Sequence, residues 1–263
     1  MAFKTWRTGF HLQQDSVLAV SVTQERTGWC LRRWWHIPLP AGIIRDGKII
    51  QPEQLVAALR DWSQALPHYH RLFIAFPAAR TLQKTLPAPA LTLRDSEQAS
   101  WIASAMSREL EMPPEALCFD YTQDTFSRAF HVTAAQNQEV AALLTLGESL
   151  RLHVAAITPD AAALANLLPL LDPPAQCVAW CDGQHWLWSM RHQWGRKRVD
   201  EAKDVAELAA LLALSPEDIT LFDGAARDPF SLLARSQPPL PECGADFTVA
   251  WPSRWENSSS DND

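Results

Sequence analysis

The sequence predicts an α/β fold with two lobes, and three observations support this prediction. Ribbons rich in Trp and Arg open the two halves of the chain, at residues 8–38 and again at 176–199. Each ribbon consists of a strand-like run, a tight polar turn, a second run and a third run. Alternating helix and strand signals follow each ribbon, which is typical of a sheet covered by helices. The two copies share this pattern, which indicates a duplicated architecture, but they share little sequence identity.

Composition places the chain among globular proteins and excludes several classes. The 263 residues are 47% hydrophobic and 20% charged, which is enough apolar material for a real core. The longest apolar run, residues 161–171, contains Asn166 and Pro169 and is far shorter than the roughly 18 residues of a membrane span. A net charge of −7 argues against a broad nucleic-acid-binding surface. The five scattered Cys residues and the lack of a secretory signal lead us to expect a cytoplasmic protein.

The first half of the chain supplies most of the expected elements. Gln13 and Gln14 form a turn before a strand at 15–22, a further strand follows at 28–37, and Asp46 and Gly47 form the turn of a hairpin at 43–50. Pro52 begins a helix, and Asp95 can cap another that ends near residue 110. Further strands are expected at 71–76, 81–86, 117–121, 130–134 and 154–157, and further helices at 138–150 and 159–168.

The second half begins after a predicted linker, Asp172-Pro173-Pro174. Behind the second ribbon we expect a helix at 206–214, a strand at 219–222 and a short helix at 229–233. Residues 237–244, QPPLPECG, predict an extended proline-rich segment. The polar, serine-rich residues 251–263 predict a disordered tail.

Signatures of enzymes are scarce in this sequence. Walker, GxGxxG, GxSxG and HExxH motifs are absent, and the 9 Gly residues leave little material for phosphate-binding loops. Cys177, Cys181 and His185 could line one side of a strand, but zinc needs about four ligands, so we expect no metal site.

Three further groups of polar residues have plain structural interpretations. His68 and His70 flank Tyr69 and are interpreted as solvated residues of a surface turn. The basic cluster at 195–198 is interpreted as a sheet edge, not a nucleic-acid-binding patch. The carboxylates that might form a catalytic pair are interpreted as solvated helix-end and strand-edge residues; these are Glu109, Glu111 and Asp120.

Four segments, in a fixed order, carry a resemblance to a known family. Residues 43–49, IIRDGKI, resemble a short hydrophobic-Asp-Gly-hydrophobic turn, and residues 71–89 resemble a strand and small-residue turn that lead into an inserted subdomain. Residues 107–121 resemble a helix, proline turn and strand, and residues 130–168 a strand, helix, strand and helix that close a lobe. These features resemble the PilM family of type IV pilus assembly over about residues 6–250. More narrowly they resemble its divergent HofM-like branch, which is linked to the use of extracellular DNA as a nutrient.

The resemblance implies a two-lobed actin-like ATPase (ribonuclease H-like) fold. The first lobe would comprise residues 1–172, with a small inserted subdomain at about 80–135, and the second lobe residues 173–250; residues 251–263 depart from the family as an aberrant tail. In the family, the cytoplasmic tail of PilN lies in a groove beside the inserted subdomain. The resemblance therefore implies a PilN/HofN-like inner-membrane partner, contacts with other pilus components, and a peripheral location at the inner membrane through that partner.

The nucleotide site is where the sequence departs from the family. His11 and Gln13 stand where the first phosphate loop has the acid that holds hydrated magnesium and the Gly that lets backbone N–H groups approach phosphate. We expect Trp180 and Trp186 to fill the cleft. The matched positions would form a degenerate nucleotide site with no catalytic residue, metal or cofactor, although weak binding of ATP and magnesium is left open; they are Gln13, Gln14, Asp182, Gly183, Asp223 and Gly224.

Three functions remain open from the sequence. The leading hypothesis is a non-enzymatic adaptor, a pseudo-ATPase that serves a DNA-uptake apparatus without touching DNA or inserting into the membrane. An alternative is an active actin-fold ATPase or a sugar-kinase-like phosphotransferase with an unrecognised phosphate loop. A third is a nucleic-acid-binding factor that would contact nucleic acid through the strand at 195–199.

Overall fold

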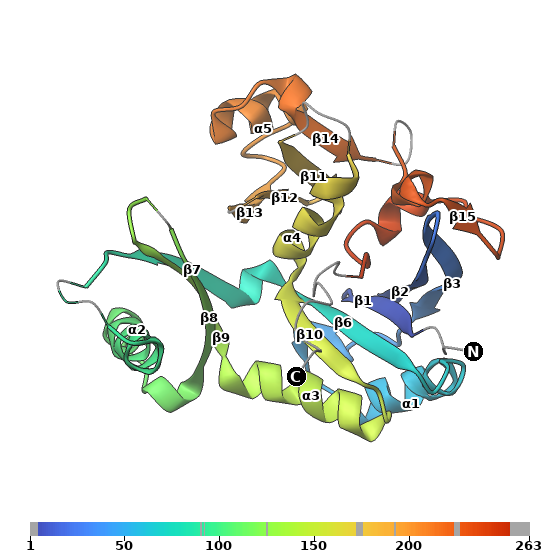
Figure 1. Cartoon of the computed structure of the whole chain (residues 1–263). Helices are drawn as coiled ribbons and strands as arrows, with labels where there is room; N and C mark the ends of the chain where they lie inside the picture. Colours follow the sequence, from blue (N-terminus) through green and yellow to red (C-terminus); the bar gives the residue numbers. More distant parts are fainter. Residues whose placement is uncertain are drawn as a thin grey trace. The chain divides into compact units, whose positions relative to one another are not determined.

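The computed structural model describes residues 5–89, 91, 93–124, 126–171, 176–191, 193–223 and 227–252, with only the backbone of 95 and 96 (Figure 1). The chain forms two compact units. The first unit comprises Met1–Ala78 and Gly147–Asp263, and the second comprises Ala79–Leu146. The predicted linker at 172–174 lies outside the described residues.

The first ribbon opens a six-stranded sheet in the first unit. It forms β1 (Trp6–Leu12), β2 (Ser16–Glu25) and β3 (Gly28–Pro38), which pair antiparallel in succession. β6 (His70–Phe76) lies parallel to β1, and β10 (Val154–Pro159) lies parallel to β6. The strand order is β10-β6-β1-β2-β3-β15, where β15 is Arg235–Ser236.

The second ribbon opens a four-stranded sheet in the same unit. β11 (Cys177–Cys181), β12 (His185–Met190) and β13 (Trp194–Arg198) pair antiparallel, and β14 (Ile219–Phe222) lies parallel to β11. The order β13-β12-β11-β14 repeats the order β3-β2-β1-β6 of the first sheet. The predicted duplication is therefore confirmed, and β10 adds a fifth strand that has no counterpart in the described part of the second sheet.

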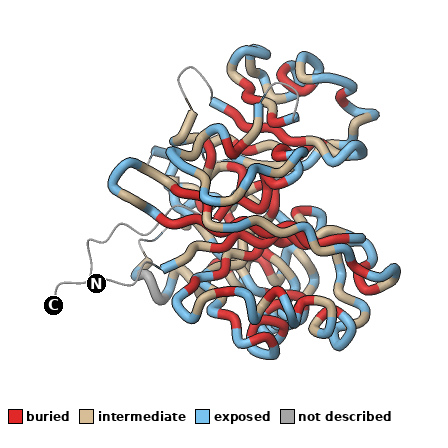
Figure 2. The backbone as a smooth tube through the Cα atoms, turned by 90° about the vertical axis from the view of Figure 1, so that its right-hand side faces the viewer, coloured by how far each residue is buried: buried red, intermediate tan, exposed pale blue. Residues whose placement is uncertain are grey.

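Helices cover the outer faces of both sheets, and a shared core joins their inner faces. α1 (Pro52–Gln64) buries Trp62 against Phe10 of the first sheet, with ring centroids 5.2 Å apart. α5 (Val205–Leu212) packs on the outer face of the second sheet, and Asp204 caps it by accepting a hydrogen bond from the Glu207 backbone N–H. The buried residues of the two inner faces form one cluster that includes Val20 and Val178. Burial is most continuous along β1 and β2, and Figure 2 marks the buried, intermediate and exposed stretches of the backbone.

The expected helix at 159–168 is mostly not an α-helix. α4 spans only Asp160–Ala163 and continues as a 3-10 helix, Leu164–Leu170, which contains Pro169. Pro169 cannot donate to the helix ladder, which agrees with the irregular ending. The remaining 3-10 helices are Ala78–Arg80, Pro114–Ala116, Pro216–Asp218, Pro229–Leu232 and Gly244–Phe247.

The C-terminal part of the described chain returns to the first sheet. β15 pairs with β3, and Trp34 Nε1 donates to the Pro239 carbonyl over 2.9 Å. Residues 244–252 then cross β1, so closely that a Cβ at Gly9 would collide with the carbonyl oxygen of Ala250. Trp251, which the sequence assigned to the disordered tail, is instead buried in the shared core; residues 253–263 lie outside the described residues.

The second unit is a three-stranded antiparallel sheet with a helix packed on it. β7 (Thr81–Leu86), β8 (Leu117–Gln123) and β9 (Phe130–Gln136) are arranged in the order β7-β9-β8. α2 (Asp95–Leu110) buries Ile102 and Met106 against this sheet, and its N-cap is Arg94, one residue before the expected Asp95. α3 (Asn137–Ser149) begins in this unit and ends in the first.

One predicted hairpin is found in full in the first unit. β4 (Ile44–Arg45) and β5 (Lys48–Ile49) pair antiparallel. Asp46 and Gly47 both have positive φ, 50° and 75°, as a two-residue type I′ turn requires.

Candidate functional site

Two hairpin turns occupy equivalent positions in the two sheets. The β1–β2 turn is closed by the Gln13 N–H donating to the Ser16 carbonyl at 2.9 Å. The β11–β12 turn is closed by the Asp182 N–H donating to the His185 carbonyl at 3.1 Å. The structure therefore places Gln13 and Gln14 in one turn, and Asp182 and Gly183 in its counterpart.

The side chains of the first turn are used within the turn itself. The Ser16 hydroxyl donates to Gln13 Oε1 at 2.9 Å and lies 3.2 Å from Asp15 Oδ1. Gln14 is exposed. Because this turn has no glycine, a bulky anion cannot approach its backbone as closely as in a glycine-containing phosphate loop.

The second turn is an Asx turn built on Asp182. Its Oδ1 accepts hydrogen bonds from the N–H groups of Gln184 at 2.8 Å and His185 at 2.6 Å. Its Oδ2 lies 3.5 Å from His185 Nδ1. Gly183 has a φ of +88°, a conformation that glycine adopts without strain. One carboxylate oxygen of Asp182 is thus committed to holding the turn.

Asp223 follows β14 directly and is exposed. Trp180 pairs with Phe222 across parallel β11 and β14. Asp223 therefore lies at the C-terminal ends of these strands, as Asp182 does. Gly224, the remaining predicted residue, lies outside the described residues.

Two aromatic rings meet where the resemblance places phosphate-loop residues. His11 and Trp180 stand two residues before their respective turns, so they are structural counterparts. Their ring centroids are 5.9 Å apart with an interplanar angle of 79°, an edge-to-face contact. His11 is 6% exposed, and its Nδ1 has no hydrogen-bond partner among the described residues. Burial lowers the pKa of His11 to about 4, against the opposing influence of Asp182, so the ring is neutral at pH 7.

Trp186, which was also expected to fill this region, does not. It belongs to the cluster under α5 on the outer face of the second sheet, where its Nε1 donates to the Ala202 carbonyl at 2.6 Å. Side chains alternate along a strand, and Trp186 lies on the opposite face from Leu187, which faces the shared core. The expectation for Trp186 was therefore wrong.

A buried carboxylate, Asp160, was missed by the sequence analysis. Its Oδ1 accepts hydrogen bonds from the N–H groups of Ala78 at 2.9 Å and Ala161 at 2.6 Å. Burial raises its pKa to about 6; Asp182 acts in the same direction, and Arg196 and the two backbone bonds oppose it. The Pro159-Asp160 pair at the end of β10 is the sequence signal that could have drawn attention to it.

The other residues considered from the sequence do not form a second site. Cys177 is buried, which raises the pKa of its thiol to about 12, and the described residues contain no group of three His, Cys, Asp or Glu that could hold a metal ion. Glu109 forms an ion pair with Lys84. The basic residues 195–198 lie on β13, at the edge of its sheet. His70 is 7% exposed at the start of β6, so its interpretation as a solvated turn residue was wrong.

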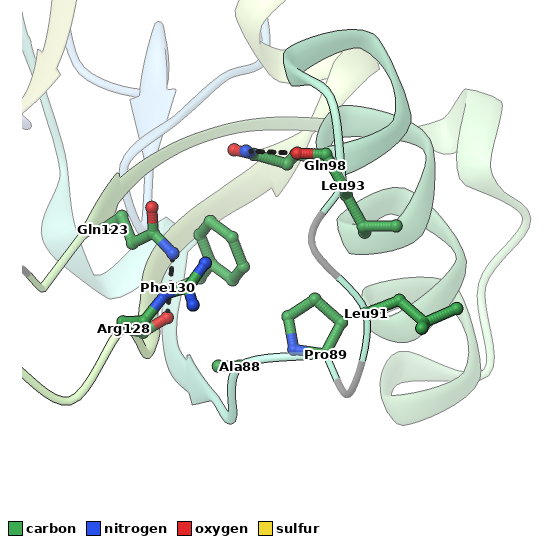
Figure 3. A pocket seen from close by; sticks show the side chains of 8 residues that line it. All are labelled: Ala88, Pro89, Leu91, Leu93, Gln98, Gln123, Arg128 and Phe130. Carbon is green, nitrogen blue, oxygen red and sulfur yellow. Dashed lines mark hydrogen bonds between the residues drawn. The ribbon is translucent and has the colours of Figure 1, made fainter.

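The second unit contains a small pocket of about 30 Å³ (Figure 3). Its walls come from the segment before α2, from α2 itself and from the β8–β9 hairpin. Gln98 Nε2 donates to the Leu93 carbonyl at 3.2 Å, and Gln123 Nε2 donates to the Arg128 carbonyl at 3.1 Å, so both amides hold the loops around it. Leu91, at the rim, is 76% exposed. The lining residues are Ala88, Pro89, Leu91, Leu93, Gln98, Gln123, Arg128 and Phe130.

Comparison with known proteins identifies the family and the fold. No protein-family model matches the chain. The chain is 46% identical over 250 residues to the DNA utilization protein HofM of Escherichia coli (strain K12), covering 95% of this chain and 96% of that protein. No helix among the described residues is long and apolar enough to cross a membrane.

Two solved structures have the same fold at low identity. One is a chain of the PilM-PilN type IV pilus biogenesis complex, with a TM-score of 0.70, 15% identity, and coverage of 94% of this chain and 97% of that one. The other is the cytoplasmic domain of EpsL, an inner membrane component of the type II secretion system of Vibrio cholerae, with a TM-score of 0.54, 12% identity, and coverage of 92% and 93%. The expected actin-like ATPase fold is thereby confirmed. By its identity and coverage, the chain belongs to the HofM family, whose fold is that of PilM.

Proposed function

We propose that this protein is a cytoplasmic adaptor of a type IV pilus-like DNA-uptake apparatus. Its role would be to bind the cytoplasmic tail of a PilN/HofN-like inner-membrane protein, which would hold it at the membrane surface. Two findings support this proposal: the HofM relative is a DNA utilization protein, and the PilM fold occurs in a complex with PilN. In this view the protein contributes to the use of extracellular DNA as a nutrient without contacting DNA.

We further propose that the ancestral nucleotide site is degenerate. The observation that carries this proposal is the edge-to-face contact of His11 and Trp180 at the paired phosphate-loop positions. A neutral, buried imidazole cannot replace a carboxylate that holds hydrated magnesium, because magnesium prefers oxygen ligands. The resulting protein would be a pseudo-ATPase scaffold.

The pocket of the second unit is a suitable place for one anchor of the partner tail. It is small, and its lining includes the buried Phe130 and the exposed Leu91. Peptide capture commonly depends on a few apolar anchors, so one short side chain in this pocket could contribute much of the binding energy. Arg128 at the rim would favour a nearby acidic group on the tail.

A charge placed at this rim tests the proposal. We expect Leu91→Glu to weaken binding of a synthetic peptide of the partner tail by about tenfold or more, and to abolish growth on DNA as nutrient. The substitution removes an apolar contact surface, and its carboxylate competes with an acidic group of the tail for Arg128. Leu211→Glu on α5 is a matched control, because Leu211 is also an exposed leucine, at 53%. Equal effects of the two variants, with both folded, would exclude the pocket as the docking site.

The same purified protein separates the alternatives. Magnesium-dependent ATP hydrolysis would identify an actin-fold ATPase or a sugar-kinase-like phosphotransferase. Affinity for DNA that falls steeply with salt would identify a nucleic-acid-binding factor.

A further inference from the structure

Three histidines gather where β6 and β10 begin. His68 and His70 come from the turn into β6, and His153 precedes β10. The ring of His153 lies 5.3 Å from that of His70 and 6.4 Å from that of His68, measured between centroids. His70 is buried, at 7% exposure.

Both nitrogens of His70 are engaged with backbone groups whose roles are fixed. Nδ1 lies 2.7 Å from the Pro67 carbonyl oxygen, which can only accept, so Nδ1 carries the proton. Nε2 lies 3.2 Å from the backbone N–H of His153, which can only donate, so Nε2 must present its lone pair. These two contacts define one neutral tautomer, with hydrogen on Nδ1.

The bond to His153 extends the β6–β10 ladder by one step. The next step is the Leu72 N–H donating to the His153 carbonyl at 2.7 Å, followed by the pairing of Val154 with Leu72. β10 is the edge strand of its sheet, and it follows directly on the turn that ends α3, where the Leu152 N–H donates to the Gly147 carbonyl. His70 therefore fastens the start of β10, which in the described part of the chain pairs with a strand on one side only.

We propose that His70 is a pH-sensitive clamp, which holds the turn between α3 and β10 on β6 when neutral and releases it when protonated. Protonation adds a hydrogen to Nε2, so that two donors face each other and the bond to His153 is lost. The released turn would leave the first step of the β10 ladder open while the rest of the sheet remains paired. This inference does not depend on the proposed function.

The surroundings of His70 favour the neutral, clamped form at pH 7. Burial lowers the pKa of His70 below its ordinary value of 6.5, and protonated His153 and His68 lower it further, while the Pro67 carbonyl opposes them. Among the described residues, the charged or titratable groups that act on it are these two histidines, one from each segment that meets it. Acidification therefore has to overcome this lowered pKa of His70 before the clamp is released.

Nuclear magnetic resonance on the full chain tests the clamp. We expect the His70 ring to show the tautomer protonated on Nδ1 at pH 7.5 and to titrate below pH 6.5. The backbone amide of His153 should shift with the same midpoint, and its hydrogen exchange, corrected for intrinsic rate, should accelerate about tenfold or more as pH falls from 7.5 to below that midpoint.

Two variants complete this experiment. His70→Gln retains an acceptor near the Nε2 position but cannot titrate, so the exchange of the His153 amide should lose its pH dependence. His131→Gln removes a half-buried histidine of β9 that is bonded to Thr85, and it should leave the pH dependence unchanged. The clamp is refuted if the His153 amide does not follow the His70 ring, or if His70→Gln behaves as the parent protein. Should His70→Gln fail to fold, the tautomer and the shared midpoint in the parent protein decide alone.

Discussion

At the scale of single residues, two buried groups, His11 on β1 and Asp160 on α4, have pKa values shifted in opposite directions. His11 is held neutral and Asp160 resists ionisation, and in both cases burial is the largest cause. The pKa of His11 falls from 6.5 to about 4, so its contribution to stability is present above pH 6.5 and is lost as pH falls toward 4. The pKa of Asp160 rises from 3.8 to about 6, so the cost of its charge is present above pH 6 and is relieved as pH falls toward 3.8. The two contributions largely cancel between pH 6 and 4.

Asp160→Asn should remove the contribution of Asp160 to the pH dependence of stability and leave that of His11. The amide oxygen can still accept from Ala78 and Ala161, while the buried charge is removed. We expect the variant to be more stable than the parent by up to about 3 kcal/mol at pH 7, the equivalent of a shift of roughly two pKa units. That gain should disappear between pH 6 and 4, as measured by urea unfolding across this range. A loss of stability at pH 7 would show that the carboxylate charge, contrary to this account, stabilises the fold.

Residue-level roles were the hardest to predict from the sequence. His70 follows a polar segment and resembles a surface residue, yet the ladder between β6 and β10 buries it. Asp160 has no motif around it, and its burial depends on elements far apart in the chain, as its bond to Ala78 shows. Trp186 was assigned to the wrong face because side chains alternate along a strand. Without a known register, the sequence does not tell which residues face the core.

At the scale of elements, the ribbon-and-sheet pattern was predictable and the C-terminal crossing was not. Strand alternation and turn residues are local signals, and they marked both ribbons and the Asp46-Gly47 hairpin. β15 has only two residues, too few to show any periodicity, and it exists because β3 offers it an edge. The segment at 244–252 is in place because its apolar residues complete the shared core.

The close crossing of β1 by this segment makes a prediction about Gly9. A side chain here meets backbone atoms of Ala250 and Pro252, which cannot move aside like a flexible side chain. We expect Gly9→Ala to destabilise the protein by about 2 kcal/mol or more through overpacking, measured by chemical unfolding. Gly183→Ala is the control, because its Cβ would meet open space. Only the strain of a positive φ should then reduce the stability, by about 1 kcal/mol. If Gly9→Ala were the milder change, the segment at 244–252 would not lie on β1 as described.

At the scale of the whole molecule, the chain has an actin-like fold, and we propose that this fold serves as a scaffold. The sequence predicted this fold through the order of its motifs, which none of the motifs could do singly. The proposed loss of an acid and a glycine from the first phosphate loop also came from the sequence, because it is a change of residue type. The sequence could not reveal that the rings of His11 and Trp180 contact each other, since that contact joins residues 169 positions apart, from 11 to 180. The assignment of Gly224 to the nucleotide site stays a prediction.

Isothermal titration calorimetry of the purified chain tests the central claim most directly. The protein is titrated with magnesium-ATP and, separately, with a peptide of the cytoplasmic tail of its PilN/HofN-like partner. The account predicts saturable heat with the peptide, no binding of nucleotide, and an unchanged peptide affinity when nucleotide is present. Nucleotide binding that strengthened the binding of the peptide would contradict it, because the phosphate loops would then still work as a switch.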